Sequence, residues 1–275
     1  MNKIPNISVI VSTYNRPEAL KLVLLALNAQ EGNHKFEVVV ADDGSTVETK
    51  YLIKNMRKLV NYDLKYVWHE DLGFRAASSR NKAVSISKGD YLIFLDGDCL
   101  PRNNFIKNHL KLIEKNYFVA GNRVLLSEKI TRYMLAHRIN IRNWPLSSWL
   151  KMRWQKNLNR FVALLDLPLA KLRKLGSNNW QKVRTCNMAV SRKDFFRVNG
   201  FDEKYQGWGY EDSDLAVRLI NSNVKRKLGH YATTVIHLWH KESDRSQENK
   251  NLTRLHKRIH NKTTLAENGI SQYVE

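Results

Sequence analysis

Short strand-like runs alternate with helix-like segments along the first hundred residues, and this alternation limits the possible folds more than any other feature of the chain. The strand-like runs are apolar and rich in β-branched residues, as buried strands are, and they cover 7–12, 36–40, 64–68 and 91–95. Helix-like periodicity separates them. This order predicts an α/β fold with a doubly wound, mostly parallel sheet, in which ligands bind at the carboxyl ends of the strands.

Polar loops follow three of the predicted strands, and two of these loops carry paired carboxylates. The loops are Thr13 to Arg16, Asp42 to Ser45 and Asp96 to Asp98. Like charges one residue apart raise each other's pKa unless a cation lies between them, and Mg²⁺ or Mn²⁺ prefers such oxygen ligands and also binds diphosphates. Asp96-Gly97-Asp98 therefore predicts a metal and diphosphate site. A strand-ending turn is the alternative there, and Asp42-Asp43-Gly44-Ser45 alone also fits a turn before a helix.

In combination, these motifs resemble those of the inverting family 2 glycosyltransferases, which have the GT-A (Rossmann-like) fold. The resemblance rests on four segments in the same order, Val11–Pro17, Ala41–Ser45, Arg80-Asn81 and Phe94–Asp98. It implies a UDP-sugar donor and a metal cofactor, Mn²⁺ or Mg²⁺. The donor-side residues that it implies are Thr13, Tyr14, Arg16 and one of Asp42 or Asp43 around the base and ribose, Arg80 near the nucleotide, Asp96 and Gly97 near the ribose and metal, and Asp98 on the metal.

A second signature lies in the C-terminal half, at Gly207-Trp208-Gly209-Tyr210-Glu211-Asp212. It resembles the Trp-Gly…Glu-Asp segment of galactosyltransferase-type and chondroitin-polymerase-type members. The resemblance implies that Asp212 is the general base and that Glu211 binds the acceptor. Trp208, as a stacking surface for a sugar, and Gly209 would bind the acceptor as well. The alternatives are that the acids merely stabilise a helix N-terminus and that Trp208 is a core residue.

Two histidines, His237 and His240, stand near the end of a strand predicted over 233–239. Strand alternation places them on opposite faces if the strand continues, so we expect only one of them to be a metal ligand. Relatives of this type complete the metal site with a late histidine. The segment Glu242 to Arg245 that follows makes His240 resemble that position more closely than His237 does.

The resemblance also implies the course of the reaction, a single in-line displacement with inversion. Asp212 would activate the acceptor, and a metal on Asp98 and His240 would neutralise charge on the departing diphosphate. Processive synthases of this family carry membrane spans and a Gln-x-x-Arg-Trp motif, and this sequence has neither. We therefore expect transfer of a single sugar to a glycan or lipid-linked glycan acceptor, with bacterial lipopolysaccharide or capsule synthesis as the setting.

Residues 132–184 form a basic segment that the motifs do not cover. They contain seven Arg and five Lys but a single acid, Asp166, and they also hold Trp144, Trp149, Trp154 and Trp180. This composition suits an anionic membrane surface, where Lys and Arg meet headgroups and Trp lies at the interface, and we favour that interpretation. A nucleic-acid-binding face and a plain solvated surface are the alternatives.

We expect four parts in the chain: a nucleotide-sugar half at 1–125, a basic helical insert at 126–184, an acceptor and catalytic half at 185–245, and a basic helical tail at 246–275. The start lacks the pattern of a signal peptide, two cysteines are too few for a disulfide framework, and no apolar run of about 18 residues occurs. These features predict a cytoplasmic protein with a peripheral contact to the inner face of the bacterial membrane.

The net charge of +20 raises a rival from another class, a non-catalytic nucleic-acid-binding protein. Acidic strand ends are a poor surface for a phosphate backbone, so we do not expect nucleic acid as a partner. A nucleotidyltransferase is the nearer rival, because it could share the sheet and the acidic metal site. It does not need the segment from Trp208 to Asp212.

Overall fold

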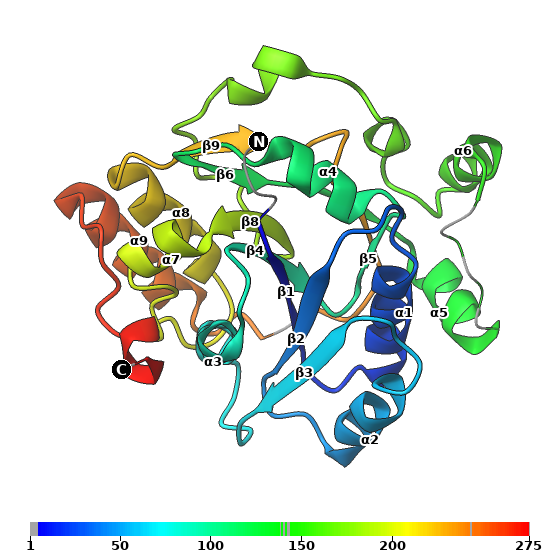
Figure 1. Ribbon diagram of the computed structural model, residues 1–275, viewed down its shortest axis with the longest axis horizontal. Helices are drawn as coiled ribbons and strands as arrows, with labels where there is room; N and C mark the ends of the chain where they lie inside the picture. Colours follow the sequence, from blue (N-terminus) through cyan, green and yellow to red (C-terminus); the bar gives the residue numbers. More distant parts are fainter. Residues whose placement is uncertain (1–4, 138, 140, 142–143, 243, 275) are drawn as a thin grey trace.

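The computed structural model describes residues 5–137, 139, 141, 144–242 and 244–274. In this part of the chain the strands form a larger and a smaller sheet (Figure 1). Along the larger, seven-stranded sheet the order is β3 (Asp63–Trp68), β2 (Phe36–Asp42), β1 (Ile7–Thr13), β4 (Tyr91–Asp96), β8 (Asn187–Ser191), β6 (Tyr117–Ala120) and β9 (Lys225–Leu228).

The larger sheet is mostly parallel, as predicted. β1 pairs in parallel with β2 and β4, β2 with β3, and β6 with β9, whereas β8 runs antiparallel to both β4 and β6. The four strands predicted from the sequence lie within β1 to β4, which are neighbours in this sheet. Their carboxyl ends, and the polar loops that follow them, therefore meet at one edge.

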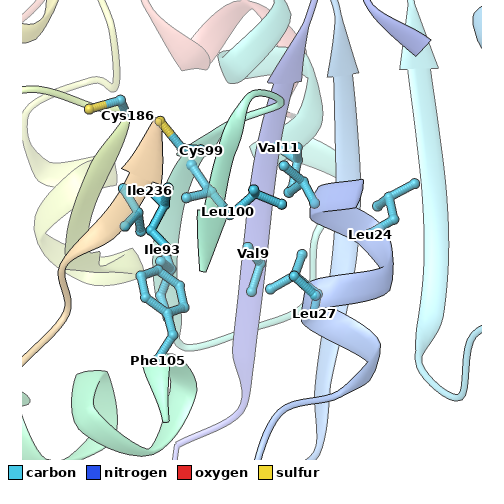
Figure 2. Packing of buried hydrophobic residues seen from close by; sticks show 14 of the residues in the cluster. Val9, Val11, Leu24, Leu27, Ile93, Cys99, Leu100, Phe105, Cys186 and Ile236 are labelled. Atoms are coloured by element: carbon cyan, nitrogen blue, oxygen red, sulfur yellow. The ribbon is translucent and has the colours of Figure 1, made fainter. Parts of the chain in front are cut away.

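Helices cover both faces of the larger sheet. On one face lie α1 (Pro17–Asn28), α2 (Val47–Met56) and α4 (Phe105–Leu112), and on the other lie α3 (Ala76–Ile86), α7 (Arg192–Arg197) and α8 (Glu211–Asn221). Alternation along β1 explains the two layers, because Val9 and Val11 pack in the first and Ile10 packs in the second. Figure 2 shows Val9 and Val11 near Leu24 and Leu27 of α1.

The smaller sheet consists of β5 (Cys99–Pro101), β10 (Val235–His237) and β7 (Arg123–Leu125), with β10 in the middle. The strand predicted over 233–239 is thus shorter than expected, and it belongs to a sheet that the sequence did not predict. β10 pairs antiparallel with β5, so that His237 lies opposite Cys99, the residue after Asp98. The smaller sheet therefore brings the late histidines to the end of β4.

The segment at 126–184 is helical only in part. It contains α5 (Glu128–His137) and α6 (Leu146–Trp154), and then mainly irregular backbone with the short helices η1 (Val162–Leu164) and η2 (Ala170–Lys174). Arg138 and Arg142 lie outside the described residues. In Figure 1 this green segment lies outside the sheet and its helices, beside β5 and then across the edge that β6 and β9 form. No helix of the described residues has the length and hydropathy to cross a bilayer.

The C-terminal tail packs against the second half of the fold. Its helix α9 (Glu248–Asn261) lies beside α8, and η3 (Ile270–Tyr273) beside α3. Arg258 of α9 is buried and donates hydrogen bonds to Asp202 at 2.5 Å and to Asp214 at 2.9 Å. A basic residue of the tail is therefore the counter-ion of two buried acids, and the tail is part of the folded core.

Candidate active site

The site begins at the edge where β1 and β4 end. These strands pair with Ser12 opposite Asp96, so that Thr13 and Gly97 follow side by side. The Gly97 amide donates a hydrogen bond to the Ser12 carbonyl at 2.7 Å, and a Cβ on Gly97 would lie only 2.9 Å from that oxygen. Glycine is therefore needed where the carboxylates of Asp96 and Asp98 leave the sheet.

Arg80 of α3 connects the two halves of the site. Its buried guanidinium lies 3.3 Å from a carboxylate oxygen of Asp96, at the end of β4. It lies 3.3 Å from Glu211 and 3.6 Å from Asp212, at the start of α8. Burial lowers the pKa of Arg80, but the three carboxylates outweigh burial and raise this pKa above its usual value. Carboxylates from two motifs that are far apart in the sequence thus share one permanent counter-ion.

Burial and neighbouring charges raise the pKa of two of these carboxyl groups. Burial is the main cause that raises the pKa of Asp96 to about 6, and the charges of Asp98 and Asp212 add to it. Burial, followed by the Asp212 charge, raises the pKa of Glu211 to about 7. Arg80 offsets both shifts only in part. Shifted carboxyl groups around a cation are typical of functional sites, as opposed to ordinary surface acids.

Asp212 lies in the first turn of α8 and is held by Thr185. The Thr185 amide donates a hydrogen bond to Oδ2 of Asp212 at 3.0 Å, and the Thr185 hydroxyl donates to Oδ1. Thr185 is itself fully buried, a few residues before Asn187 begins β8. These two bonds fix the direction of the Asp212 carboxylate. Thr185 could not be identified from the sequence, because a single threonine outside any motif carries no signal.

Asp98 lies among nitrogen-bearing side chains. Arg16 donates a hydrogen bond to its Oδ2 at 2.5 Å, and Nε2 of His240 and of His237 lie 3.4 and 3.6 Å from its two oxygens. Strand alternation does not separate the two histidines, because the strand does not continue to His240. Since β10 ends at His237, the chain turns beyond it and the two imidazole rings lie 5.1 Å apart. Both histidines are therefore near Asp98, and so is Arg16, which the resemblance had implied near the base and ribose.

The residues around Asp98 fit a divalent cation. Within the described residues, Asp98 Oδ1 is buried and has no hydrogen-bond partner. Burial is the main cause that lowers the pKa of His237 to about 4, so its ring is neutral near pH 7, as a metal ligand must be. Burial also raises the pKa of the Cys99 thiol well above its usual value. Oxygen and imidazole ligands are thus available, which suits Mn²⁺ or Mg²⁺, and the Cys99 thiol lies in the same group of possible ligand atoms as Asp98 and His237.

The paired carboxylates at the end of β2 are already engaged within the protein. Asp42 is buried and accepts hydrogen bonds from the Tyr66 hydroxyl at 2.7 Å and the Ser45 amide at 2.8 Å. Asp43 is also buried, and its Oδ1 lies 2.7 Å from His69 Nε2. The bond to Ser45 is the turn geometry that this motif predicts on its own. Both residues help to hold the loop that faces the end of β1.

Thr13 is the last residue of β1, and Tyr14 begins the loop that follows this strand. Thr13 is buried, whereas Tyr14 is exposed and its hydroxyl donates a hydrogen bond to Asp71 at 2.8 Å. The Asp71 backbone packs so closely on Gly44 that a Cβ there would lie 2.6 Å from the Asp71 Cα. Three loops that follow different strands are therefore tied together around Tyr14.

Trp208 lies in the loop that leads into α8. The loop is tightly turned, because Gly207, Gly209 and Tyr210 all have positive φ angles, of 73°, 109° and 71°. Trp208 is half-buried, and the guanidinium of Arg245 lies 4.4 Å from its ring centre. Trp208 belongs to neither of the buried apolar clusters of the described residues, which argues against the core alternative. Its exposed part remains available for contact with a ligand.

Comparison with known families finds a match in each half of the chain. Glycosyl transferase family 2 matches residues 8–169, and the family described as the N-terminal domain of galactosyltransferase matches residues 171–263. The first match includes Arg80, Asp96 and Asp98, and the second includes Glu211 and Asp212. The two matched regions thus supply the two sets of carboxylates that meet at Arg80.

Curated relatives are similar over most of this chain. Validoxylamine A glucosyltransferase from Streptomyces hygroscopicus subsp. limoneus is 30% identical over 228 residues, covering 78% of this chain and 48% of the relative. Chondroitin synthase from Escherichia coli is 26% identical over 223 residues, covering 78% of this chain and 32% of the relative. The chain therefore spans about half or less of the length of these relatives.

Solved structures share the fold. Mannosyltransferase PcManGT from Pyrobaculum calidifontis, in complex with GDP-Man and Mn²⁺, superimposes with a TM-score of 0.63 at 17% identity, covering 94% of this chain and 65% of that one. GalNAc-T7 with UDP, GalNAc and Mn²⁺ gives a TM-score of 0.64 at 16% identity, with 94% and 48% covered. These neighbours confirm the predicted GT-A fold. Since the family 2 match spans more than half of the chain, this protein belongs to glycosyl transferase family 2.

Proposed function

We propose that the protein transfers a single sugar from a UDP-sugar to a hydroxyl group of a glycan acceptor, with inversion at the anomeric carbon. The observation that carries this proposal is the position of Arg80 between Asp96 and Asp212. It brings the donor-side carboxylates and the candidate base to one cluster, so that both can flank one sugar. Inversion requires a single displacement and no enzyme-bound sugar, and the proposal assigns no nucleophile to the protein.

On the donor side, Asp96 and Asp98 would hold Mn²⁺ or Mg²⁺, with His240 or His237 completing the ligand set. The orphaned oxygen of Asp98 and the two neighbouring imidazoles support this assignment. When bound, the cation would neutralise charge on the departing diphosphate. The solved neighbours named above contain UDP or GDP-Man together with Mn²⁺, which supports a nucleotide-sugar donor.

Asp212 is the proposed general base. Thr185 holds both of its oxygens, so the carboxylate keeps one direction while the acceptor binds. Asp212 takes the proton from the acceptor hydroxyl as that oxygen attacks the anomeric carbon. The bond from this carbon to the diphosphate breaks, and the nucleoside diphosphate leaves with the electron pair. Arg80 offsets part of the negative charge of the cluster throughout.

Glu211, Trp208 and Gly209 would bind the acceptor. They lie at or just before the start of α8, next to Asp212 in the chain. We propose a glycan or a lipid-linked glycan as the acceptor class and synthesis of a bacterial surface polysaccharide, such as lipopolysaccharide or capsule, as the setting. The name of one relative, a chondroitin synthase, supports a glycan acceptor.

A panel of UDP-sugars tests this proposal. The protein is incubated with each UDP-sugar and Mn²⁺, Mg²⁺ or EDTA, and release of UDP and the melting temperature are measured. UDP with Mn²⁺ is expected to raise the melting temperature by about 5 °C at a hundredfold excess over Kd. GDP and a DNA duplex serve as controls.

The outcomes separate the proposal from its rivals. Full turnover after exhaustive treatment with EDTA would overturn the role of the metal. Stabilisation by DNA and not by UDP would overturn the donor assignment. A nucleotidyltransferase would instead release pyrophosphate from a nucleoside triphosphate and a sugar phosphate.

A further inference from the structure

The outer side of α6 carries apolar side chains in contact with solvent. Leu146, Leu150 and Trp154 are 52%, 55% and 85% exposed. They are spaced four residues apart, so they form one stripe along the helix. On the opposite side, Trp149 and Met152 are buried in the core. The helix is therefore anchored by one side, and the stripe, defined by these three exposed residues, faces away from the protein.

The structure changes the role of the tryptophans in this segment. Trp144 packs against the core with its ring 5.5 Å from that of Trp149, and Trp180 packs against the second apolar cluster. Of the four tryptophans, Trp154 is thus the one that projects into solvent, and two leucines accompany it. The apolar surface of the segment is more confined than its sequence indicates.

Unpaired cations lie beside the stripe. Lys151 and Arg153 are exposed and, by helical geometry, flank the stripe on its two sides. Neither has an ion pair with a carboxylate of the described residues. The two acids of residues 128–184 are already engaged, Glu128 by Arg132 and Asp166 by Arg102. The positive charge around the stripe is therefore not neutralised by any carboxylate of the described residues.

We propose that this side of α6 docks the protein on an anionic lipid bilayer. The leucines and Trp154 would enter the boundary between headgroups and acyl chains, while Lys151 and Arg153 meet anionic headgroups. A nucleic acid would satisfy the cations but would leave the leucine stripe against water and phosphate. Near η2, Leu172 and Leu175 are also exposed beside the exposed Lys171, whereas Lys174 there is paired with Glu114. The contact requires neither donor nor metal.

Flotation of the full chain with vesicles tests the proposal. Equimolar phosphatidylglycerol and phosphatidylcholine vesicles are compared with pure phosphatidylcholine vesicles. We expect binding to the first and little to the second. The triple variant Leu146→Ser, Leu150→Ser, Trp154→Ser is expected to lose at least about tenfold in partitioning, because each buried apolar side chain contributes substantially. Lys151→Gln with Arg153→Gln should lower binding to the anionic vesicles alone.

A matched variant separates the stripe from general exposure of apolar groups. Leu59, Leu265 and Tyr51 are exposed to a similar extent but lie in other parts of the structure. Changing all three to Ser removes the same kinds of side chain and should leave vesicle binding unchanged. A second readout is quenching of tryptophan fluorescence by lipids with brominated acyl chains, which Trp154→Phe should largely abolish while binding persists.

Several results would overturn the proposal. They are no flotation of the intact protein with anionic vesicles, an equal loss in the stripe variant and the matched variant, or self-association in solution that the stripe variant abolishes. Tight RNA binding that depends on Lys151 and Arg153 but not on the stripe would assign the surface to nucleic acid. Each of these results would leave glycosyl transfer untouched, because UDP release is measured without vesicles.

Discussion

The carboxylate cluster around Arg80 and the outer side of α6 differ in how their cations are buried and paired. At the cluster, the guanidinium is buried and lies within 3.6 Å of three carboxylates from two elements, β4 and α8. At α6, Lys151 and Arg153 stand in water without a described carboxylate as partner. A site that orients one small ligand benefits from charges held in place by the fold. A surface that meets many identical headgroups needs only density of charge and apolar contact.

The greatest loss of activity is expected when Asp212 is replaced. Asp212→Asn should lower kcat by about 10²- to 10⁴-fold, the usual contribution of a general base, while the affinity for the donor stays nearly the same. Steady-state kinetics and the shift in melting temperature with UDP measure the two effects. Asp166→Asn is the matched control, because Asp166 is the single acid of residues 132–184 and lies outside the cluster. Unchanged turnover in Asp212→Asn would eliminate it as the base.

A second prediction concerns the stability that Arg80 provides. Arg80→Met leaves Asp96, Glu211 and Asp212 without their shared cation, so the free energy of unfolding should fall by about 3–5 kcal/mol. The same replacement at Arg153, which is exposed, should change it by less than about 0.5 kcal/mol. Urea unfolding of both variants gives the difference. Equal changes in the free energy of unfolding would mean that the buried cation of the cluster stabilises the fold no more than the exposed cation of α6 does.

A change at Thr185 tests whether the hydrogen bonds to Asp212 contribute to catalysis. Thr185→Val removes the hydroxyl bond to Asp212 but keeps the amide bond, so kcat should fall by about tenfold, in line with one hydrogen bond to a charged group. The KM for the donor should not change, because Thr185 contacts the base side of the site. Thr185→Ser retains the hydroxyl and should restore most of the activity. A loss of donor affinity equal to the loss in kcat would argue for a general structural defect.

The smallest change in the free energy of unfolding is expected for a replacement of Leu150 on α6. Leu150→Ser should leave the free energy of unfolding within about 0.5 kcal/mol of the wild-type value, since the side chain is already in water. The same change at Leu158, which is buried in the core, is the positive control for the measurement. A marked loss of stability in Leu150→Ser would show that its side chain is covered by other parts of the protein in solution.

The sequence predicted the parts of the structure that local patterns encode. β1 to β4 could be read from their runs of buried residues, and Asp96 and Asp98 from their place after such a run. The smaller sheet could not, because its strands are only three residues long and pair residues more than a hundred positions apart. For the same reason the approach of His237 to Asp98, and the bonds between Thr185 and Asp212, depend on tertiary contacts that no local pattern records.

The tryptophans give the same lesson on the surface. All four looked alike in the sequence, and only the packing of Trp144, Trp149 and Trp180 reveals that Trp154 alone among them projects outward. Composition can therefore predict that a segment is basic and aromatic. Which of its side chains reach a partner depends on the face by which the helix is anchored.

The position of Arg80 also bears on how such enzymes can be recombined. Consider a chimaera that joins residues 8–169 of this chain to the second half of a relative. Arg80 would come from this chain, whereas the acids at the positions of Glu211 and Asp212 would come from the relative, because the cation and these two acids belong to different matched regions. Exchanges that preserve this charge balance should yield folded hybrids. Exchanges that alter it would leave a buried charge without a partner where the two parts meet, even if the backbones superimpose well.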